Sequence, residues 1–263
     1  MNKLAKYIGF FAVLAVFANM ASAVLFVDSQ GHVLTATNGV VLNYQSGSGW
    51  VPPQSASLIA WYRFTTNETV TLVDSSGMNN WATNFGTTWA TNSRAFTSGN
   101  SISMTNASTG DNPSNMTISL WVNFGSTIEQ SFAGKIQTIH GSVGGWELLH
   151  LTGKEYFLFQ QSSSQYVERE EGLNLADGNW HHILATKAGW TNCFIYTDGT
   201  NNTGPLYVSG SVATMANGYW FVCGMESDGI HGKFVGKLAN IMWWTNILSY
   251  TEITNVTANT YPN

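Results

Sequence analysis

Two adjacent histidines, His181 and His182, are the first residues whose types could support metal or acid–base chemistry. They follow Trp180 in the stretch DGNWHHILATK, which has the apolar alternation of a β-strand. Successive strand side chains point to opposite faces, so the two imidazoles cannot bind one ion together, and no third histidine stands two residues away. We therefore interpret the pair as structural, with His182 on the face of Trp180 and His181 on the face of Ile183.

Aromatic residues in polar, loop-like contexts form a second group of candidates. The chain has 11 Trp and 10 Tyr, more than a core of this size normally needs. Sugars bind through apolar faces set on aromatic rings, while amides hold their hydroxyls. The loop VDSSGMNNWATN is expected to present Asn79, Asn80 and Trp81 after an Asx-type turn at Asp74. Trp146, which follows the flexible GSVGG, is the other expected ligand-binding residue.

Cys193 and Cys223 are the only cysteines in the chain. In an oxidising compartment an even pair most simply forms one disulfide, and this bridge is our prediction. Two buried free thiols are the alternative, because two cysteines alone fix no geometry.

The composition favours a folded extracellular protein. Of the 263 residues, 44% are hydrophobic and only 10% are charged, so the polar surface must consist mostly of Asn, Thr, Ser and Gly. Residues 1–23 are typical of a secretory signal peptide, with Lys3 and Lys6 before an apolar run and the small residues ASA at the cleavage site. After cleavage 8 basic residues face 15 acidic ones, with no basic cluster, which argues against nucleic acid and anionic membranes as partners.

Short alternating apolar stretches, separated by turn residues, recur from residue 57 onward without helical periods between them. This pattern predicts an all-β fold, a two-sheet antiparallel β-sandwich. Residues 24–56 carry three shorter apolar bursts and then VPP, and are expected to form a β-rich N-terminal extension and linker. One helix is expected near the end, where Ser249 and Glu252 form a capping box before YTEITNVTA.

Five segments of the chain resemble the laminin-G-like, concanavalin A-like jelly-roll domains. The stretch DGNWHHILATKAGWTNCFIYTDG resembles the family's WHH strand pair, and LIAWYRF with VDSSGMNNWAT resembles its opening. RAFTSGNSISM, MTISLWVNF and FVGKLANIMWWTNILSYTEI resemble three further segments, in the family's order, so the likeness covers residues 58–258. It implies a concanavalin A-like jelly roll over residues 57–263.

The resemblance also suggests glycoside hydrolysis as an alternative function. Hydrolases of this architecture carry E-x-D-x-x-E on one strand, which places two carboxylates about 5 Å apart on one face. The nearest stretch here is VEREEG, in which Glu168 and Glu170 share a face while Glu171 falls on the other. We therefore expect a protein that is not an enzyme.

Calcium is the cofactor that the resemblance suggests, since many members hold one ion at the rim of the sandwich. Asp74 matches the first ligand, but the second position is Ala239, which offers no side-chain oxygen, and Asn240 replaces the neighbouring acid. We expect this site to be weak or absent. Asp228 in ESDG could compensate, but no sequence pattern places it there.

The function that these observations favour is non-catalytic binding of an extracellular glycan or cell-surface polymer by a secreted protein. The first alternative is a structural or filament-forming subunit, in which the extension adds a strand to a neighbouring copy and the protein self-associates. The second alternative is a glycoside hydrolase, because fold does not fix function.

Overall fold

The computed structural model describes residues 24–27, 33–36, 43–44, 50–104 and 112–262. The predicted signal peptide, residues 1–23, lies outside the described residues. The chain separates into two compact units, Met1–Val51 and Pro52–Asn263. Within the described residues, no helix has the length and apolar character needed to cross a membrane.

The first unit contains a small antiparallel sheet of three strands in the order β1-β2-β3. These strands are β1 (Val24–Val27), β2 (Val33–Ala36) and β3 (Asn43–Tyr44). They coincide with the three apolar bursts of the expected extension. The exact boundary between extension and main domain stays a prediction.

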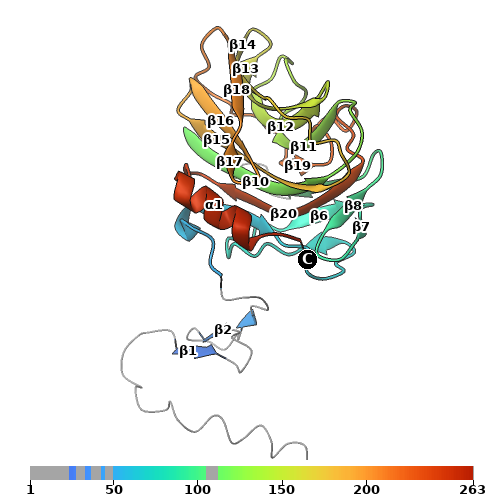
Figure 1. The fold of residues 1–263 in the computed structure, drawn as a ribbon, viewed down its shortest axis with the longest axis vertical. Coiled ribbons are helices and arrows are strands. Elements are labelled where there is room, and N and C mark those ends of the chain that lie inside the picture. Colours follow the sequence, from blue (N-terminus) through green and yellow to red (C-terminus); the bar gives the residue numbers. More distant parts are fainter. Residues whose placement is uncertain (1–23, 28–32, 37–42, 45–49, 105–111, 263) are drawn as a thin grey trace, which may run out of the picture. The chain divides into compact units, whose positions relative to one another are not determined.

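The second unit consists of two antiparallel sheets packed face to face, which confirms the predicted sandwich (Figure 1). The eight-stranded sheet has the order β17-β16-β15-β10-β20-β8-β7, with β4 also paired to β20. Its strands are β4 (Leu58–Tyr62), β7 (Thr88–Trp89), β8 (Arg94–Phe96), β10 (Asn115–Asn123), β15 (Trp180–Ala188), β16 (Asn192–Thr197), β17 (Thr200–Asn201) and β20 (Gly236–Trp244).

The nine-stranded sheet has the order β18-β14-β13-β12-β11-β19-β9-β6-β5. Its strands are β5 (Thr71–Leu72), β6 (Ala82–Phe85), β9 (Ser101–Met104), β11 (Gln130–Lys135), β12 (Gly145–Leu151), β13 (Lys154–Ser162), β14 (Gln165–Glu171), β18 (Thr203–Ser209) and β19 (Val222–Cys223). A short 3-10 helix, Ser55–Ser57, leads into β4.

The outer face of the eight-stranded sheet is covered by the helix α1 (Tyr250–Asn259) and the residues after it (Figure 1). The predicted capping box is confirmed: the Ser249 hydroxyl accepts from the Glu252 backbone N–H, and the Glu252 carboxylate accepts from the Ser249 backbone N–H. The indole N–H of Trp121 on β10 donates to Thr260 Oγ1 at 2.8 Å. This cover explains why β10 is buried on both faces.

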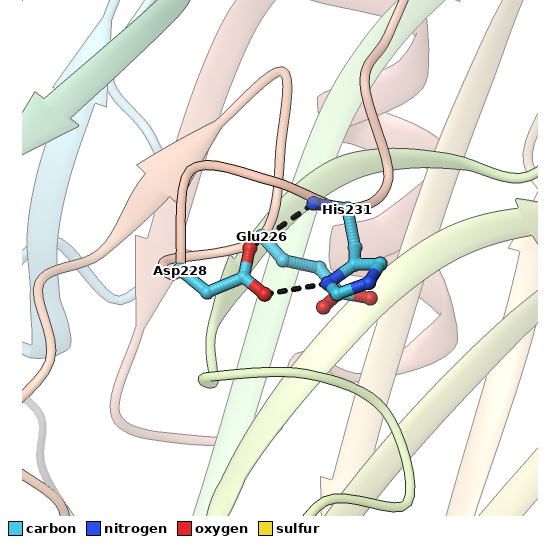
Figure 2. Close-up of side chains that lie close together, drawn as sticks. All are labelled: Glu226, Asp228 and His231. Carbon is cyan, nitrogen blue, oxygen red and sulfur yellow. Dashed lines mark hydrogen bonds and ion pairs between the residues drawn. The ribbon is translucent and has the colours of Figure 1, made fainter.

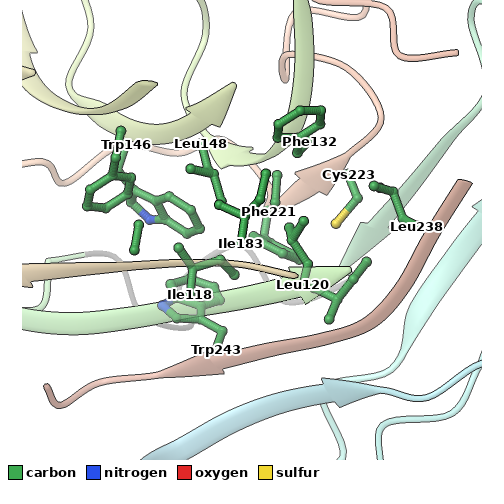
Figure 3. Close-up of a cluster of buried hydrophobic side chains, with 14 of the residues drawn as sticks. Ile118, Leu120, Phe132, Trp146, Leu148, Ile183, Phe221, Cys223, Leu238 and Trp243 are labelled. Carbon is green, nitrogen blue, oxygen red and sulfur yellow. The ribbon is translucent and has the colours of Figure 1, made fainter. Parts of the chain in front are cut away.

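The core between the sheets is a cluster of aliphatic and aromatic side chains (Figure 3). Inward-facing residues alternate with outward-facing ones, so that Ile118 and Leu120 on β10 face Phe132 and Leu148 from the other sheet (Figure 3). Trp243 on β20 stacks on Phe221, with ring centroids 5.1 Å apart. Aromatic contacts of this kind stabilise the fold beyond the effect of the apolar area that the core removes from water.

The predicted disulfide is wrong, because Cys193 and Cys223 are both free and buried. Cys193 lies on β16, near one edge of the eight-stranded sheet, whereas Cys223 lies on β19, in the middle of the nine-stranded sheet. Each thiol fills the core as a small apolar group. Burial raises the pKa of Cys193 to about 12 and also raises the pKa of Cys223, which keeps both thiols protonated.

We expect both thiols to react with iodoacetamide only after unfolding, because burial denies the reagent access and suppresses the thiolate. Mass spectrometry of the unreduced chain should show two carbamidomethyl groups after denaturation and none after a brief native treatment. A species two hydrogens lighter that takes up no label would contradict this assignment.

Candidate functional site

The Asp74 loop is organised by the carboxylate of Asp74. This carboxylate accepts from the backbone N–H of Trp61 at 2.8 Å, of Ser76 at 2.9 Å and of Asn80 at 2.9 Å. The Ser76 hydroxyl adds a fourth bond at 2.7 Å, and the side chain of Asp74 is buried. Asp74 therefore closes an Asx-type turn and ties it to β4.

Asn80 is not an exposed ligand-binding residue, so this prediction is wrong. Its side-chain NH2 donates to the Ile59 backbone carbonyl at 2.7 Å, and its backbone carbonyl accepts from the Tyr62 hydroxyl at 2.5 Å. The residue is buried beside β4. An amide that satisfies backbone groups in the interior cannot also hold a sugar hydroxyl.

The second position of the calcium site suggested by the family is also occupied by structural contacts. Ala239 on β20 is fully buried, and the adjacent Asn240 uses its amide to donate to the Thr260 carbonyl at 2.6 Å. The Asn240 side-chain oxygen accepts from the indole N–H of Trp61 at 3.4 Å. These contacts fix the C-terminal segment against the sheet.

Asn79 and Trp81 are the two members of the predicted set that reach the surface. Asn79 is exposed in the left-handed region, with φ 58°, which asparagine tolerates better than most residues. Trp81 is 47% exposed and directly precedes β6, whose Ala82 points into the core. Strand alternation therefore places Trp81 on the outer face of the nine-stranded sheet, on the same side as the exposed Phe85.

Trp146 is a core residue, and its prediction as the second wall of the site is wrong. It belongs to β12, is fully buried, and packs with its ring centroid 5.1 Å from Trp243 and 5.8 Å from Phe221 (Figure 3). The strand begins at Gly145, the last residue of the glycine-rich stretch GSVGG that was expected to be a loop. Its indole is therefore directed between the sheets.

Trp220, which was not predicted from the sequence, is exposed at the surface, as Trp146 was expected to be. It is 51% exposed, while its neighbour Phe221 is buried in the core, so Trp220 faces outward. The strands β6 and β19 both pair with β9, and the backbone N–H of Met104 at the end of β9 donates to the Phe221 carbonyl at 2.9 Å. Met104 is also the partner of Ala82.

The exposed indoles Trp81 and Trp220 thus face the same outer side, just before β6 and β19, the two strands that flank β9. Strands are spaced about 4.8 Å apart, so β6 and β19, on either side of β9, run about 10 Å from each other. We call this pair, Trp81 and Trp220, the aromatic pair. The alternation of GYWFVC could have indicated that Trp220 and Phe221 face opposite ways, but not which of them faces the core.

The histidine pair has the structural role predicted for it. His182 is fully buried under α1: its Nε2 lies 2.8 Å from Ser119 Oγ and its Nδ1 lies 2.9 Å from Thr257 Oγ1. Burial lowers the pKa of His182 to about 3, so the ring is neutral. His181 lies on the opposite face, between Asp198 at 2.9 Å and Asp177 at 3.2 Å.

The acidic stretch on β14 is occupied by ion pairs and hydrogen bonds. Glu168 lies 3.1 Å from Nε2 of His140, and Glu170 binds Lys154 and accepts from the hydroxyl of Tyr207 at 3.2 Å. Glu171 is buried and accepts from a threonine hydroxyl, and burial raises its pKa to about 8. The three carboxylates thus have different partners and different degrees of burial.

Two antiparallel sheets packed face to face, with one helix on the outside, define a lectin-like jelly roll. A family model described as the concanavalin A-like lectin/glucanases superfamily, of the laminin G type, matches residues 96–254. The chain therefore belongs to this superfamily, as the sequence resemblance predicted. A search of curated proteins found no match.

Several solved structures share this fold. The binding domain of Paraclostridial Mosquitocidal Protein 1 has 15% identity and a TM-score of 0.59, covering 77% of this chain and 52% of that one. The botulinum neurotoxin serotype D binding domain has 17% identity and a TM-score of 0.57, covering 78% and 51%. The chain thus spans about half the length of these proteins, and at such identities the likeness shows the fold alone.

Proposed function

We propose that this chain is a secreted, non-catalytic module that binds an extracellular glycan on the outer face of the nine-stranded sheet. The observation that carries the proposal is the aromatic pair, in which Trp81 and Trp220 expose their rings on one face of the sheet. Pyranose rings present apolar C–H faces that pack on indoles, and each buried face contributes on the order of 1–2 kcal/mol. The exposed amide of Asn79 lies two residues from Trp81 and can hold a hydroxyl.

Three further lines of observation support this proposal. The fold is that of lectins, and the solved structures with similar folds are described as binding domains. The carboxylates of Glu168 and Glu170 are each held by a basic side chain, so neither is poised as the free nucleophile of a retaining glycosidase. The low charge content and the signal-like residues 1–23 support secretion.

A glycan array probed with the chain lacking residues 1–23 should identify the bound glycan. We expect Trp81→Ala and Trp220→Ala each to weaken binding of that glycan about tenfold, which equals about 1.4 kcal/mol, while the melting temperature stays close to that of wild type. Tyr250→Ala is the matched control, because Tyr250 is also an exposed aromatic residue but lies on α1, outside the aromatic pair.

Three outcomes would contradict the proposal. If Trp81→Ala unfolds the domain, the ring is structural rather than ligand-binding. If both tryptophan variants bind and fold as wild type does, the site lies elsewhere and assembly through the N-terminal extension gains support. Release of reducing sugars from the bound glycan would favour the hydrolase.

A further inference from the structure

The loop between β19 and β20 brings three metal-binding side chain types together. The ligand atoms of Glu226, Asp228 and His231 all lie within 4.8 Å of one another (Figure 2). Glu226 is buried, Asp228 is half-buried and His231 is exposed. The group therefore runs from the interior to the surface, which gives an ion a path of entry.

The loop holds these side chains in fixed positions. Asp228 Oδ1 accepts from the backbone N–H of Ile230 at 2.7 Å and of His231 at 3.1 Å. Asp228 Oδ2 lies 2.5 Å from Nδ1 of the His231 ring (Figure 2). This contact orients the imidazole and leaves its other nitrogen available, and of the roughly four lone-pair sites of the Asp228 carboxylate these contacts use three, so one remains for an ion.

A third carboxylate, that of Glu147, lies in the sheet close enough to interact with Glu226 and Asp228. Glu147 is on β12 between Trp146 and Leu148, which both point into the core, so its side chain is directed to the outer face of the sheet. It is fully buried, and neither of its carboxylate oxygens has a hydrogen-bond partner. The hydroxyl of Ser131 lies close enough to lower the pKa of the Glu147 carboxyl, which opposes the larger effect of burial.

Glu147 and the carboxylates of the loop interact electrostatically. Burial raises the pKa of Glu147 well above its ordinary value, and the neighbouring carboxylate of Glu226 raises it further. Burial likewise raises the pKa of Glu226 to about 6. Buried carboxylates without donors are costly to keep in a fold unless a cation or a proton neutralises them.

We propose that Glu147, Glu226, Asp228 and His231 bind one divalent cation on the outer face of the nine-stranded sheet. The donor set of three carboxylates and one imidazole fits the ions that accept both oxygen and nitrogen, Zn²⁺ and Mn²⁺. Calcium fits less well, because it takes six to eight oxygen ligands. The site is separate from the Asp74 and Ala239 positions and does not depend on glycan binding.

A second group of acidic and histidine side chains, on the eight-stranded sheet, serves as a comparison for the proposed cation site. His181 lies between Asp177 and Asp198, so it has the same types of side chain within hydrogen-bonding distance. The buried carboxylate beside it, Glu171, accepts through Oε1 from the Thr197 hydroxyl, whereas both carboxylate oxygens of Glu147 and of Glu226 are without a partner. We assign no cation to this second group, and it supplies the matched control.

The test uses the untagged chain lacking residues 1–23, freed of metal with a chelator and titrated calorimetrically with Zn²⁺, Mn²⁺ and Ca²⁺ at pH 7.5. We expect one equivalent of Zn²⁺ or Mn²⁺ to bind. At a hundredfold excess over Kd, the melting temperature should rise by roughly 5–10 °C.

Variants locate the ion. Glu226→Gln and His231→Gln should each weaken binding at least about tenfold, and His231 is exposed, so its replacement leaves the fold intact. Glu147→Gln should also weaken binding without lowering the stability of the metal-free chain, because it removes a buried carboxylate. His181→Gln should bind as wild type does.

Absence of Zn²⁺ and Mn²⁺ binding at millimolar concentration would overturn the proposal. Binding that survives both Glu226→Gln and His231→Gln would place the ion elsewhere and would overturn it as well. Calcium binding alone, insensitive to His231→Gln, would reject the assigned class of ion.

Discussion

Trp146→Ala should lower the free energy of unfolding by about 3–5 kcal/mol, the range for deleting a large buried aromatic side chain. The ring lies between the sheets against Trp243 and Phe221, and no surface side chain can refill the volume. Urea denaturation followed by far-UV circular dichroism measures the loss. Trp146→Phe should cost less, because it keeps an aromatic ring and removes an indole N–H that has no hydrogen-bond partner.

The comparison with Trp220→Ala makes this test specific. Trp220 is half exposed, so its truncation should change stability by well under the loss expected for Trp146. Normal stability together with lost glycan binding in Trp146→Ala would return that residue to the ligand site.

Acidification should destabilise the wild-type domain through His182, and His182→Gln should remove this effect. In the folded state Thr257 Oγ1 donates to the Ile253 carbonyl at 3.0 Å, so it accepts from Nδ1 of His182, and Nε2 accepts from Ser119. The ring is thus a neutral imidazole with both nitrogens satisfied. Its replacement by glutamine should cost roughly 1–3 kcal/mol at pH 7.5.

The sign of the pH effect follows from the two states of His182. Its pKa is about 3 in the folded chain, whereas an exposed histidine has a value of about 6.5. Between these values only the unfolded state takes up the proton, so stability is complete above pH 6.5 and falls as the pH decreases. The loss is about 1.4 kcal/mol per pH unit, or about 2 kcal/mol between pH 6.5 and 5.

Urea denaturation of wild type and His182→Gln at pH 7.5 and 5 isolates this contribution. Glu171 and Glu226 have raised pKa values and oppose it, because their protonated forms are favoured in the fold at lower pH. These groups are common to both chains and cancel in the difference. Equal pH dependence in the two chains would show that His182 is not the buried neutral ring described above.

The sequence was sufficient where local chemistry decides structure. Alternation assigned the two histidines to opposite faces, and the Ser249–Glu252 capping box located the helix. The ordered segments of the family resemblance predicted the sandwich. Each of these predictions depends on residues within one or two turns of each other, or on a pattern repeated along the chain.

Burial and long-range proximity could not be predicted in the same way. Trp146 and Trp81 both follow polar or glycine-rich residues, yet the first begins a core strand and the second reaches the surface. The cation cluster joins Glu147 to a loop that begins after residue 223, and only the order of strands in the sheet brings them together. The one local feature of the sequence that could have indicated this cluster is the glutamate inside the apolar strand GWELLHL.

The position of β20 has a consequence for how the chain folds. This strand, Gly236–Trp244, pairs with β10 along one edge and with β4 and β8 along the other. The eight-stranded sheet therefore cannot close until the chain up to Trp244 has left the ribosome. Contacts of such long sequence separation make folding slow, so the sandwich should form only after β20 has been synthesised.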